Sequence, residues 1–367
     1  MVLSWVSVNA NDGSIIADLP TLRVDGALKQ TLMRYESQTA SLPLGVPGTP
    51  DAAPANWPQA TRDGAVFLVA LDEANAPVWG GMVTKRTRKV GDGVKLGLVT
   101  AEGYFDRVYV GDETFTASAQ NIIVKTLGEK YAKTGAKRGL PLRVQIVGGN
   151  GVARDRAYAD KDDKTLYSVL SDLSGVIGGS EWTVGWEWVS ASQLGLVLTV
   201  ADRVGSPAPA GLNPAAQFYL PGSVTDAELV EGYGSSEGAN DVMATSSGAG
   251  DARPQSDHQA NTGDLRPRFE YRWSPSTSIT DVGTLNAHAQ RALAAMKDGT
   301  LALTLTANRQ EAPQLGRDWF IGDDIGFDIT APEFPGGIYG TARAVGWEMT
   351  DTTITPLLDV TAIGGIN

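Results

Sequence analysis

A dense group of acidic side chains near the C-terminus offers the first candidates for chemistry. The group consists of Asp318, Asp323, Asp324, Asp328 and Glu333. Such a group suggests a calcium site or the carboxylate pair of a glycosidase. The spacing lacks the ligand pattern of a calcium loop, and Gly322-Asp323 stands where a hairpin turn is expected. We therefore interpret these residues as turn carboxylates on a solvated face.

Three tryptophans recur at every second or fourth position of one predicted strand. They are Trp182, Trp186 and Trp188, and Val184 shares their face. Such a stripe is typical either of a sugar-stacking platform or of a core-facing strand. We favour the core, because the preceding predicted helix carries an apolar stripe that needs a partner. That stripe includes Leu166, Leu170 and Leu173.

A basic strand, Lys85, Arg86, Arg88 and Lys89, resembles a phosphate-binding patch when taken alone. Alternation along a strand places Arg86 and Arg88 on one face and leaves the lysines elsewhere. A solvated or interface strand is therefore the preferred interpretation. In an assembly, this strand would pair with acidic surfaces of neighbouring subunits.

The other polar motifs do not specify an active site. Gly148–Gly151 lacks the order of a phosphate-binding loop, and no helix is expected to begin there. His258 lies in a predicted mobile loop and His288 on a helix stripe, each without a Ser or Asp partner nearby in sequence. We predict no catalytic, cofactor-binding or metal-binding residues, no cofactor, and no enzymatic activity.

Composition limits the class of protein. The 367 residues are 42% hydrophobic and include 43 glycines and 19 prolines, which is typical of a folded chain with many turns and short strands. The absence of cysteine excludes disulfides, thiolate metal sites and cysteine nucleophiles, and two histidines are too few for a multi-histidine cluster. The N-terminus has no signal-peptide pattern, and no apolar run is long enough to span a membrane. We expect a protein made in a cytoplasm.

The net charge of -12 is concentrated in the last part of the chain, because residues 221–367 carry 20 acidic and nine basic residues. Such a surface repels nucleic-acid backbones. Solubility alone explains it as well as a functional acidic face does.

The first part of the chain is predicted to be antiparallel β structure. Its central feature is the stretch 78–115, where two β-rich runs, Trp79–Lys89 and Val94–Thr100, flank Val90-Gly91-Asp92-Gly93. An Asp-Gly pair in this context predicts a hairpin. A third strand is expected over Gly103–Val110. The other expected elements are strands at 3–9, 15–19, 21–24, 31–35, 38–44 and 65–71, with a proline-rich loop at 43–58.

The middle part mixes helices and strands. Helices are predicted over 118–135, capped by Ser118 and stopped by Gly135, and over Asp163–Ile177. Strands are predicted at 142–147, 181–189 and 194–200, before a Gly/Pro/Ala linker at 205–211.

The last part returns to β structure. Strands are expected at 218–220, 227–233, 241–245, 268–273, 301–307, 319–329, 338–348 and 353–361, with a mobile loop at 246–267. One helix, Asp281–Met296, is predicted with Thr280 as its cap.

The Gly80-Gly81 bend, the basic strand after it and the run VTAEGYFDRVYVGDETF (99–115) resemble the baseplate-hub, or tail-tip hub, proteins of long-tailed phages. The likeness is greatest to minor tail proteins of actinobacterial siphophages, with the T4-type hub fold. The runs LALTLTA, DWFIGDDIGFDI, AVGWEM and ITPLLDV, at 301–307, 318–329, 344–349 and 354–360, resemble the C-terminal barrel of the same family.

The resemblance implies a mainly β protein in which two antiparallel β-barrel-like hub domains flank a smaller α+β domain. The expected bounds are 1–116 for the first barrel, 117–211 for the α+β domain, and 212–367 for the second barrel with its helix and mobile loop.

The implied function is that of a homotrimeric structural virion protein at the tail tip. It would adapt threefold tip components to the sixfold tail tube or distal tail ring, and it would line or close the DNA channel during infection. Its partners would be the distal tail ring, the tail tube or tape-measure protein, and tip or receptor-binding proteins. No sequence-specific DNA binding is implied, and acidic side chains facing the lumen would let the genome slide. Related proteins append a peptidase or muramidase after the hub region, and because the chain ends at Asn367 we expect none here.

A weak internal repeat agrees with this symmetry. Gly80-Gly81-Met82, Arg86 and Val99-Thr100-Ala101 are echoed by Gly336-Gly337-Ile338, Arg343 and Val360-Thr361-Ala362. Two related modules in each of three subunits would form a ring with approximate sixfold symmetry. Chance similarity between two meanders is the competing explanation.

Two other functions remain open from the sequence. The nine tryptophans and the acidic balance also suit a carbohydrate-binding or carbohydrate-active protein. A hub of a contractile-injection or secretion spike would share the same fold.

Overall fold

The computed structural model describes residues 3–47, 49, 52–133, 139–176, 178–235, 237–248, 250–275, 279–360 and 364. The chain forms two compact units. The smaller comprises residues 227–304, and the larger comprises the chain up to Asp226 together with Leu305–Asp359. The boundary falls within two strands, β15 and β19, whose bounds are given below. The division at 116 and 211 expected from the sequence stays a prediction.

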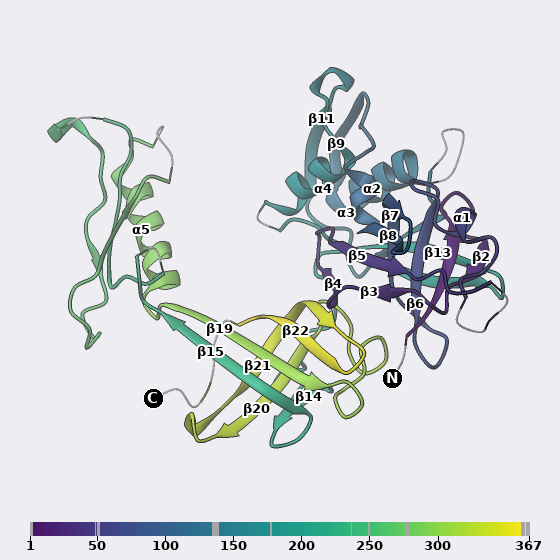
Figure 1. Ribbon diagram of the computed structural model, residues 1–367. Helices are drawn as coiled ribbons and strands as arrows, with labels where there is room; N and C mark the ends of the chain where they lie inside the picture. The colour runs from purple at the N-terminus through teal and green to yellow at the C-terminus, as the bar shows by residue number, and fades with distance from the viewer. Residues whose placement is uncertain are drawn as a thin grey trace. The chain divides into compact units, whose positions relative to one another are not determined.

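The first sheet of the larger unit is antiparallel and contains seven strands in the order β2-β1-β6-β7-β8-β5-β3 (Figure 1). The strands are β1 (Ser4–Asn9), β2 (Ile15–Asp18), β3 (Arg23–Val24), β5 (Ser37–Leu42), β6 (Val66–Leu71), β7 (Pro77–Lys89) and β8 (Gly93–Thr100). The inner strand β6 is buried along its whole length. The edge strands β2 and β3 are short and do not pair with each other, so the sheet stays open. The expected barrel is therefore wrong for this part of the chain.

The predicted hairpin is confirmed, and the strand predicted after it is not. β7 and β8 pair through a turn in which Gly91 and Gly93 have φ of +88° and +70°. After β8, the chain forms the short helix α2 (Glu102–Phe105) where we expected a strand. The reason is tertiary, because Ala101 and Phe105, four residues apart, both reach the core.

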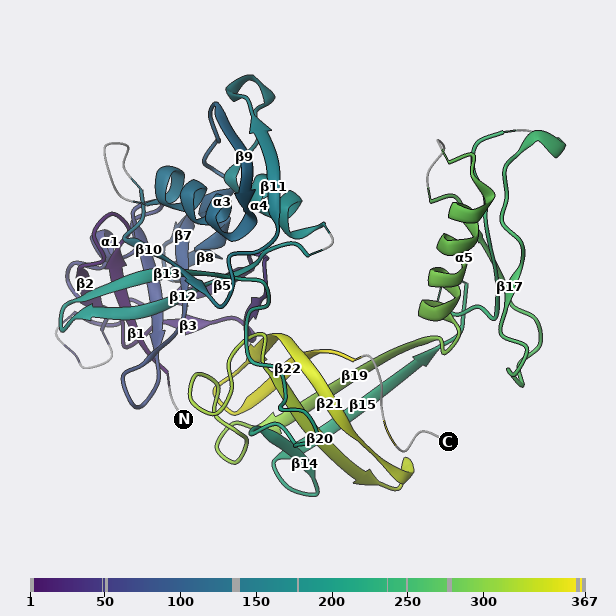
Figure 2. The same ribbon diagram turned by 180° about the vertical axis from the view of Figure 1, so that it is seen from behind.

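The second sheet contains three strands in the order β10-β13-β12, with β10 (Leu142–Val147) parallel to β13 (Gln193–Ala201) and β12 (Glu181–Ser190) antiparallel to it (Figure 2). These strands agree with the sequence-based prediction. Among the described residues, β12 pairs with a strand on one side only, β13. A separate two-stranded ribbon pairs β9 (Glu113–Ala119) with β11 (Ala153–Tyr158).

Both helices of this region are shorter than predicted. The first is α3 (Gln120–Leu127) continued by a π-helical turn, η1 (Gly128–Ala132). Ser118 does not cap it, because Ser118 is paired in β9. The second is α4 (Leu166–Ser174), capped by the Thr165 hydroxyl, which accepts from the Ser168 amide at 3.1 Å. Two expected helix-end residues, Gly135 and Ile177, lie outside the described residues.

The third sheet has seven strands, six of them in the order β14-β20-β21-β22-β19-β15. These are β14 (Gln217–Leu220), β15 (Val224–Gly232), β19 (Thr300–Asn308), β20 (Asp324–Ala331), β21 (Phe334–Met349) and β22 (Thr353–Asp359). The seventh, β4 (Leu28–Thr31), comes from the N-terminal part and pairs with the end of β21 that β20 leaves free. The strand expected at 31–35 thus ends at Thr31. This sheet is not closed into a barrel either, since β14 and β15 form its two edges.

The smaller unit places α5 (Val282–Met296) against a three-stranded sheet of β16 (Asp241–Ala244), β17 (Gln259–Ala260) and β18 (Glu270–Trp273) (Figure 1). Its core includes Val242, Ala244, Leu285 and Ala289. Asp281, and not Thr280, caps α5, because its carboxylate accepts from the Thr284 amide at 2.6 Å. The expected mobile loop at 246–267 contains β17 and the short helix η3 (Gly250–Ala252). Two other short helices, α1 (Trp57–Ala60) and η2 (Asp160–Asp162), belong to the larger unit.

A glycine is needed at position 80 because the ring of Trp186 occupies the space that a side chain would take. A Cβ atom on Gly80 would lie 2.5 Å from the indole atoms Cε2 and Nε1 of Trp186. Gly80 therefore lets β7 and β12 approach closely within one core. Gly337 has another role, because it lies within β21 with a φ of +67°, beside the register shift between β20 and β21 at Ile329–Ala331. The two glycine pairs of the suspected repeat are thus used differently, and its final residues Thr361 and Ala362 lie outside the described residues.

We expect Gly80→Ala to lower the free energy of unfolding by about 2 kcal/mol, because a rigid ring must move to admit the methyl group. Chemical denaturation measures this loss. Gly185→Ala on β12 is the matched control, since a Cβ there meets nothing within 4 Å. The double variant Gly80→Ala/Trp186→Leu should lose less free energy of unfolding than the two single variants lose in sum. Equal losses for Gly80→Ala and Gly185→Ala would contradict this account.

Candidate functional site

The tryptophan stripe belongs to the core, as the sequence analysis favoured. Trp182 is fully buried, and Trp186 and Trp188 are half-buried and pack against the same apolar cluster. Trp186 contacts Phe67 edge-on with ring centroids 5.1 Å apart. The leucine stripe of α4 lies in this cluster too. All three rings therefore pack on protein, which leaves little of the stripe for stacking on a sugar.

The acidic group is spread over turns and two positions of β20, namely Asp324, which pairs with Arg203 at 2.5 Å, and the exposed Asp328. Asp318 accepts from the Gln314 amide at 2.8 Å, and Asp323 accepts from the amides of Ser206 and Phe320 at 2.6 and 2.8 Å. Glu333 lies in the β20–β21 turn. Within the described part of the chain, no three acidic or histidine side chains are placed to hold a metal ion. The interpretation as turn carboxylates is confirmed for these three residues.

Asp328 is different, because it lies between two tyrosines on an open sheet face. The register pairs Asp328 of β20 with Tyr219 of β14 on one side and with Tyr339 of β21 on the other. Tyr219 is 46% exposed and Tyr339 is 56% exposed. Large aromatic side chains left in solvent beside a carboxylate suit a contact surface better than a catalytic site.

The basic strand has one structural and three exposed members. Arg86 donates to the Pro58 carbonyl at 2.7 Å and to the Thr61 hydroxyl at 3.3 Å, so it fixes the loop before β6. Lys85, Arg88 and Lys89 are exposed, and Lys89 lies 2.8 Å from Asp92 across the hairpin turn. The strand therefore presents fewer free cations than the sequence suggests.

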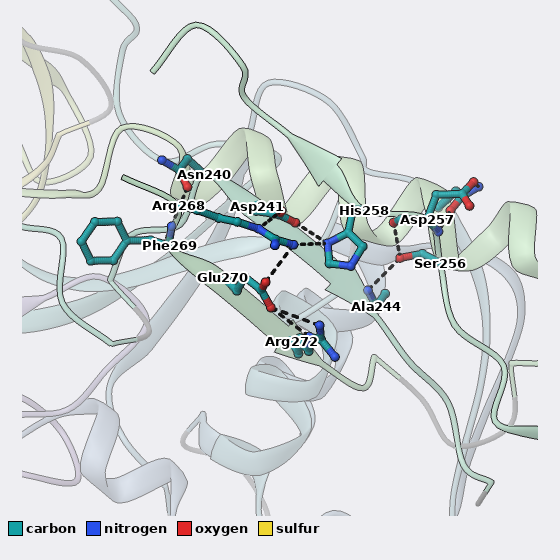
Figure 3. A network of polar contacts seen from close by, with 11 residues as sticks. Asn240, Asp241, Ala244, Ser256, Asp257, His258, Arg268, Phe269, Glu270 and Arg272 are labelled. Atoms are coloured by element: carbon teal, nitrogen blue, oxygen red, sulfur yellow. Dashed lines mark hydrogen bonds and ion pairs between the residues drawn. The ribbon is translucent and has the colours of Figure 1, made fainter. Parts of the chain in front are cut away.

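Both histidines find partners that sequence distance concealed. His288 on α5 contacts Trp273 edge-on at 6.2 Å. His258 lies at the centre of a polar network (Figure 3). Its Nδ1 atom is 2.6 Å from Asp241 Oδ1 and 3.1 Å from Arg268 Nη2. Because one nitrogen faces an acceptor and a donor, its tautomer decides which bond forms.

The same network continues along β18. Arg268 donates through Nε to Asp241 Oδ2 at 2.5 Å and pairs with Glu270 at 2.8 Å, and Arg272 pairs with Glu270 at 3.1 Å (Figure 3). Burial alone would raise the pKa of Asp241, but the hydrogen bonds and charges of His258 and Arg268 hold it below its usual range.

A catalytic triad is not formed there. Ser256 accepts from the Ala244 amide at 2.9 Å and donates to the Asp257 carbonyl at 2.8 Å, so its hydroxyl is used in folding (Figure 3). The network fastens the segment around β17 to the central strand β16. Its role is structural, and it ties the part of the predicted loop around His258 to β16.

The ion pair that joins two sheets of the larger unit was missed by the sequence analysis. Arg343 of β21 forms a two-pronged pair with Glu181 of β12, at 2.8 Å through Nη1 and with a second contact through Nη2. It also donates to the carbonyls of Val204 and Gly322 at 2.8 and 3.1 Å. Burial alone would raise the pKa of Glu181, and the hydrogen bonds of Arg343 and the Val204 amide bring it below its usual range. Only the pairing of distant strands reveals this contact.

Solved structures of phage tail proteins share this fold. The 43 kDa tail protein of prophage MuSo2 from Shewanella oneidensis aligns over 97% of this chain and 98% of its own, with a TM-score of 0.55 and 12% identity. A tail protein from Neisseria meningitidis aligns over 98% of both chains, with a TM-score of 0.53 and 12% identity. At this identity the likeness shows the fold alone. No protein-family model and no curated protein sequence matches the chain.

No helix in the described part of the chain has the length and apolar character to cross a membrane.

Proposed function

We propose that this chain is a structural component of a phage tail and acts there without bond-breaking chemistry. The observation that carries the proposal is the end-to-end fold likeness to two phage tail proteins, which leaves no large part of either chain unmatched. A fold by itself does not fix function. The use of the candidate carboxylates and histidines in turns, ion pairs and strand contacts supports a structural role.

Within the tail, we place the chain at the tip as a homotrimeric hub. Two seven-stranded sheets, one from the N-terminal part and one built mainly from the C-terminal part, supply two β modules per subunit. Three copies would then present six modules to a sixfold tail tube or distal tail ring, and three to the tip or receptor-binding proteins. The lumen of this ring would pass the tape-measure protein and then the genome. The acidic excess of residues 221–367 suits a lining that does not hold DNA.

The carbohydrate-binding alternative is less well supported. It depends on the tryptophan stripe, and Trp182 is fully buried while Trp186 packs on Phe67. The oligosaccharide-binding test of Trp186→Ala remains its direct check.

We expect the purified chain to form particles of three times the 38.6 kDa subunit mass, at least in the presence of its ring partner. Mass photometry over a range of concentrations measures this, and imaging of virions with an epitope on the chain tests its place at the tip. A monomer that stays monomeric with the partner would contradict the hub. Absence of the label from the tail would contradict the tail assignment as a whole.

A further inference from the structure

The larger unit contains a cavity of about 780 Å³ that the structural role does not use. Its walls are the start of β7, residues 183–186 of β12, and the loops at 204–206 and 314–323. This volume lies within the usual range for sites that bind small organic molecules.

Glu102 is the most deeply buried carboxyl group in the lining of this cavity. It is 2% exposed, and its Oε1 atom accepts from the Val184 amide at 3.3 Å. The Thr100 side chain also hydrogen-bonds to it. Gln30 donates to the Val184 carbonyl at 2.9 Å, so Glu102 and Gln30 occupy the place of a strand along the free edge of β12.

A second polar atom in the wall lacks a partner. Thr183 lines the cavity and is 9% exposed, and its hydroxyl oxygen makes no hydrogen bond within the described part of the chain. The oxygen has less than 1 Å² of accessible surface, so it lies behind the cavity surface and supplies no contact to a ligand.

The charges and rings of the wall favour a cation. The acidic residues in the lining are Asp72, Glu102 and Asp323, and the basic one is Arg317, which already makes two hydrogen bonds to Asp318 at 3.0 Å. Two aromatic side chains of the wall, Trp186 and Phe320, are partly exposed, whereas Trp79 and Trp347 are fully buried. Ring faces attract ammonium groups and bury apolar stems at the same time.

We propose that this cavity binds an organic ammonium ion with an apolar body, whose charge pairs with Glu102 and whose body lies against Trp186 and Phe320. The ammonium group can belong to a free amine or to a lysine side chain of another tail polypeptide. The proposal is independent of the hub assignment, because it concerns a cavity inside one unit of one chain.

Binding should be coupled to proton release. Burial raises the pKa of Glu102 to about 7, and Glu36 adds a smaller increase. The Glu102 carboxyl group is therefore mostly protonated at pH 6 when no ligand is bound. The other charged groups facing the cavity are Asp72, Asp323 and Arg317. A bound cation favours the carboxylate, and about 0.9 proton should leave per cation bound at pH 6, against about 0.1 at pH 8.

The test is calorimetric titration of the full chain with benzylamine, with benzyl alcohol as the neutral analogue. We expect benzylamine to bind at least about tenfold more tightly than benzyl alcohol at pH 8, and more weakly at pH 6. Titration in two buffers of different ionisation enthalpy gives the protons released. N-acetyl-lysine methylamide forms the second arm, and tighter binding of this compound than of benzylamine assigns the site to a partner polypeptide.

Glu102→Gln should abolish the preference for the amine over the alcohol and should abolish the proton release. Asp92→Asn, at the exposed hairpin turn, is the control for loss of one negative charge. Trp186→Leu should weaken both ligands, which provides a variant independent of Glu102. Equal binding of the amine and the alcohol, no binding of any probe, or an amine preference that survives in Glu102→Gln would overturn the proposal.

Discussion

Arg343→Met is expected to lower the free energy of unfolding by about 3 kcal/mol, because it leaves the Glu181 carboxylate without its partner in a largely buried position. The side chains of Arg343 and Glu181 are 18% and 19% exposed. The substitution also removes the donors to the Val204 and Gly322 carbonyls, so three acceptors lose a hydrogen bond at the junction of two sheets. Denaturant unfolding near pH 7 measures the loss.

Two further variants separate the ion pair from the general loss of an arginine. Arg88→Met removes an exposed arginine from β7 and should change stability by no more than about 0.5 kcal/mol. The double variant Glu181→Met/Arg343→Met should recover part of the loss, because the buried charge is removed with its partner. A loss no larger for Arg343→Met than for Arg88→Met would show that the pair does not hold the sheets together.

Glu102 is expected to make the protein less stable as the pH rises from 4.5 to 8. Burial raises its pKa from 4.5 to about 7 in the folded chain, so the folded state binds the proton more tightly than the unfolded state does. The resulting stabilisation is complete below pH 4.5, falls as the pH passes through 7, and is absent above it. A difference of this size corresponds to about 3 kcal/mol, of which about 2 kcal/mol should be lost between pH 5.5 and 8.

Glu102→Gln should remove this slope, since the amide does not titrate and keeps an oxygen to accept from the Val184 amide. The measurement is the difference in unfolding free energy between wild type and variant at pH 5.5, 7 and 8. This difference cancels the carboxylates whose pKa is lowered, such as Glu181 and Asp241, because both proteins contain them. A constant difference across this range would mean that Glu102 is charged in the folded protein at pH 5.5.

The local β pattern was predictable because its causes are local. The Asp-Gly turn fixes the β7–β8 hairpin, a continuous apolar run identifies β6, and the spacing of the tryptophans marks one face of β12. The tryptophan stripe could be assigned to the core for the same reason, since its face and that of α4 are each readable in sequence. The carboxylates at Asp318, Asp323 and Glu333 follow from turn chemistry.

The elements that were predicted wrongly depend on contacts with segments distant in the sequence. Residues 102–105 form a helical turn because Phe105 is drawn into the core, and β4 leaves the N-terminal sheet because β21 offers it an unpaired edge. The sheets stay open because their edge strands do not pair with each other, and the periodicity of a strand does not show which strands it pairs with. The partners of His258 come from β16 and the segment before β18.

By itself, the sequence determined a cysteine-free, mainly β chain with one strong hairpin, a tryptophan-lined core and an acidic C-terminal part. These features depend on composition and on residue patterns between near neighbours in the chain. The tertiary structure alone decided which carboxylates are buried and paired. Glu181 meets Arg343 across 162 residues, and Glu102 meets Val184 across 82. The physical reason is that the pKa and the energy of a buried charge depend on its surroundings in space, and those surroundings form only when distant strands pack.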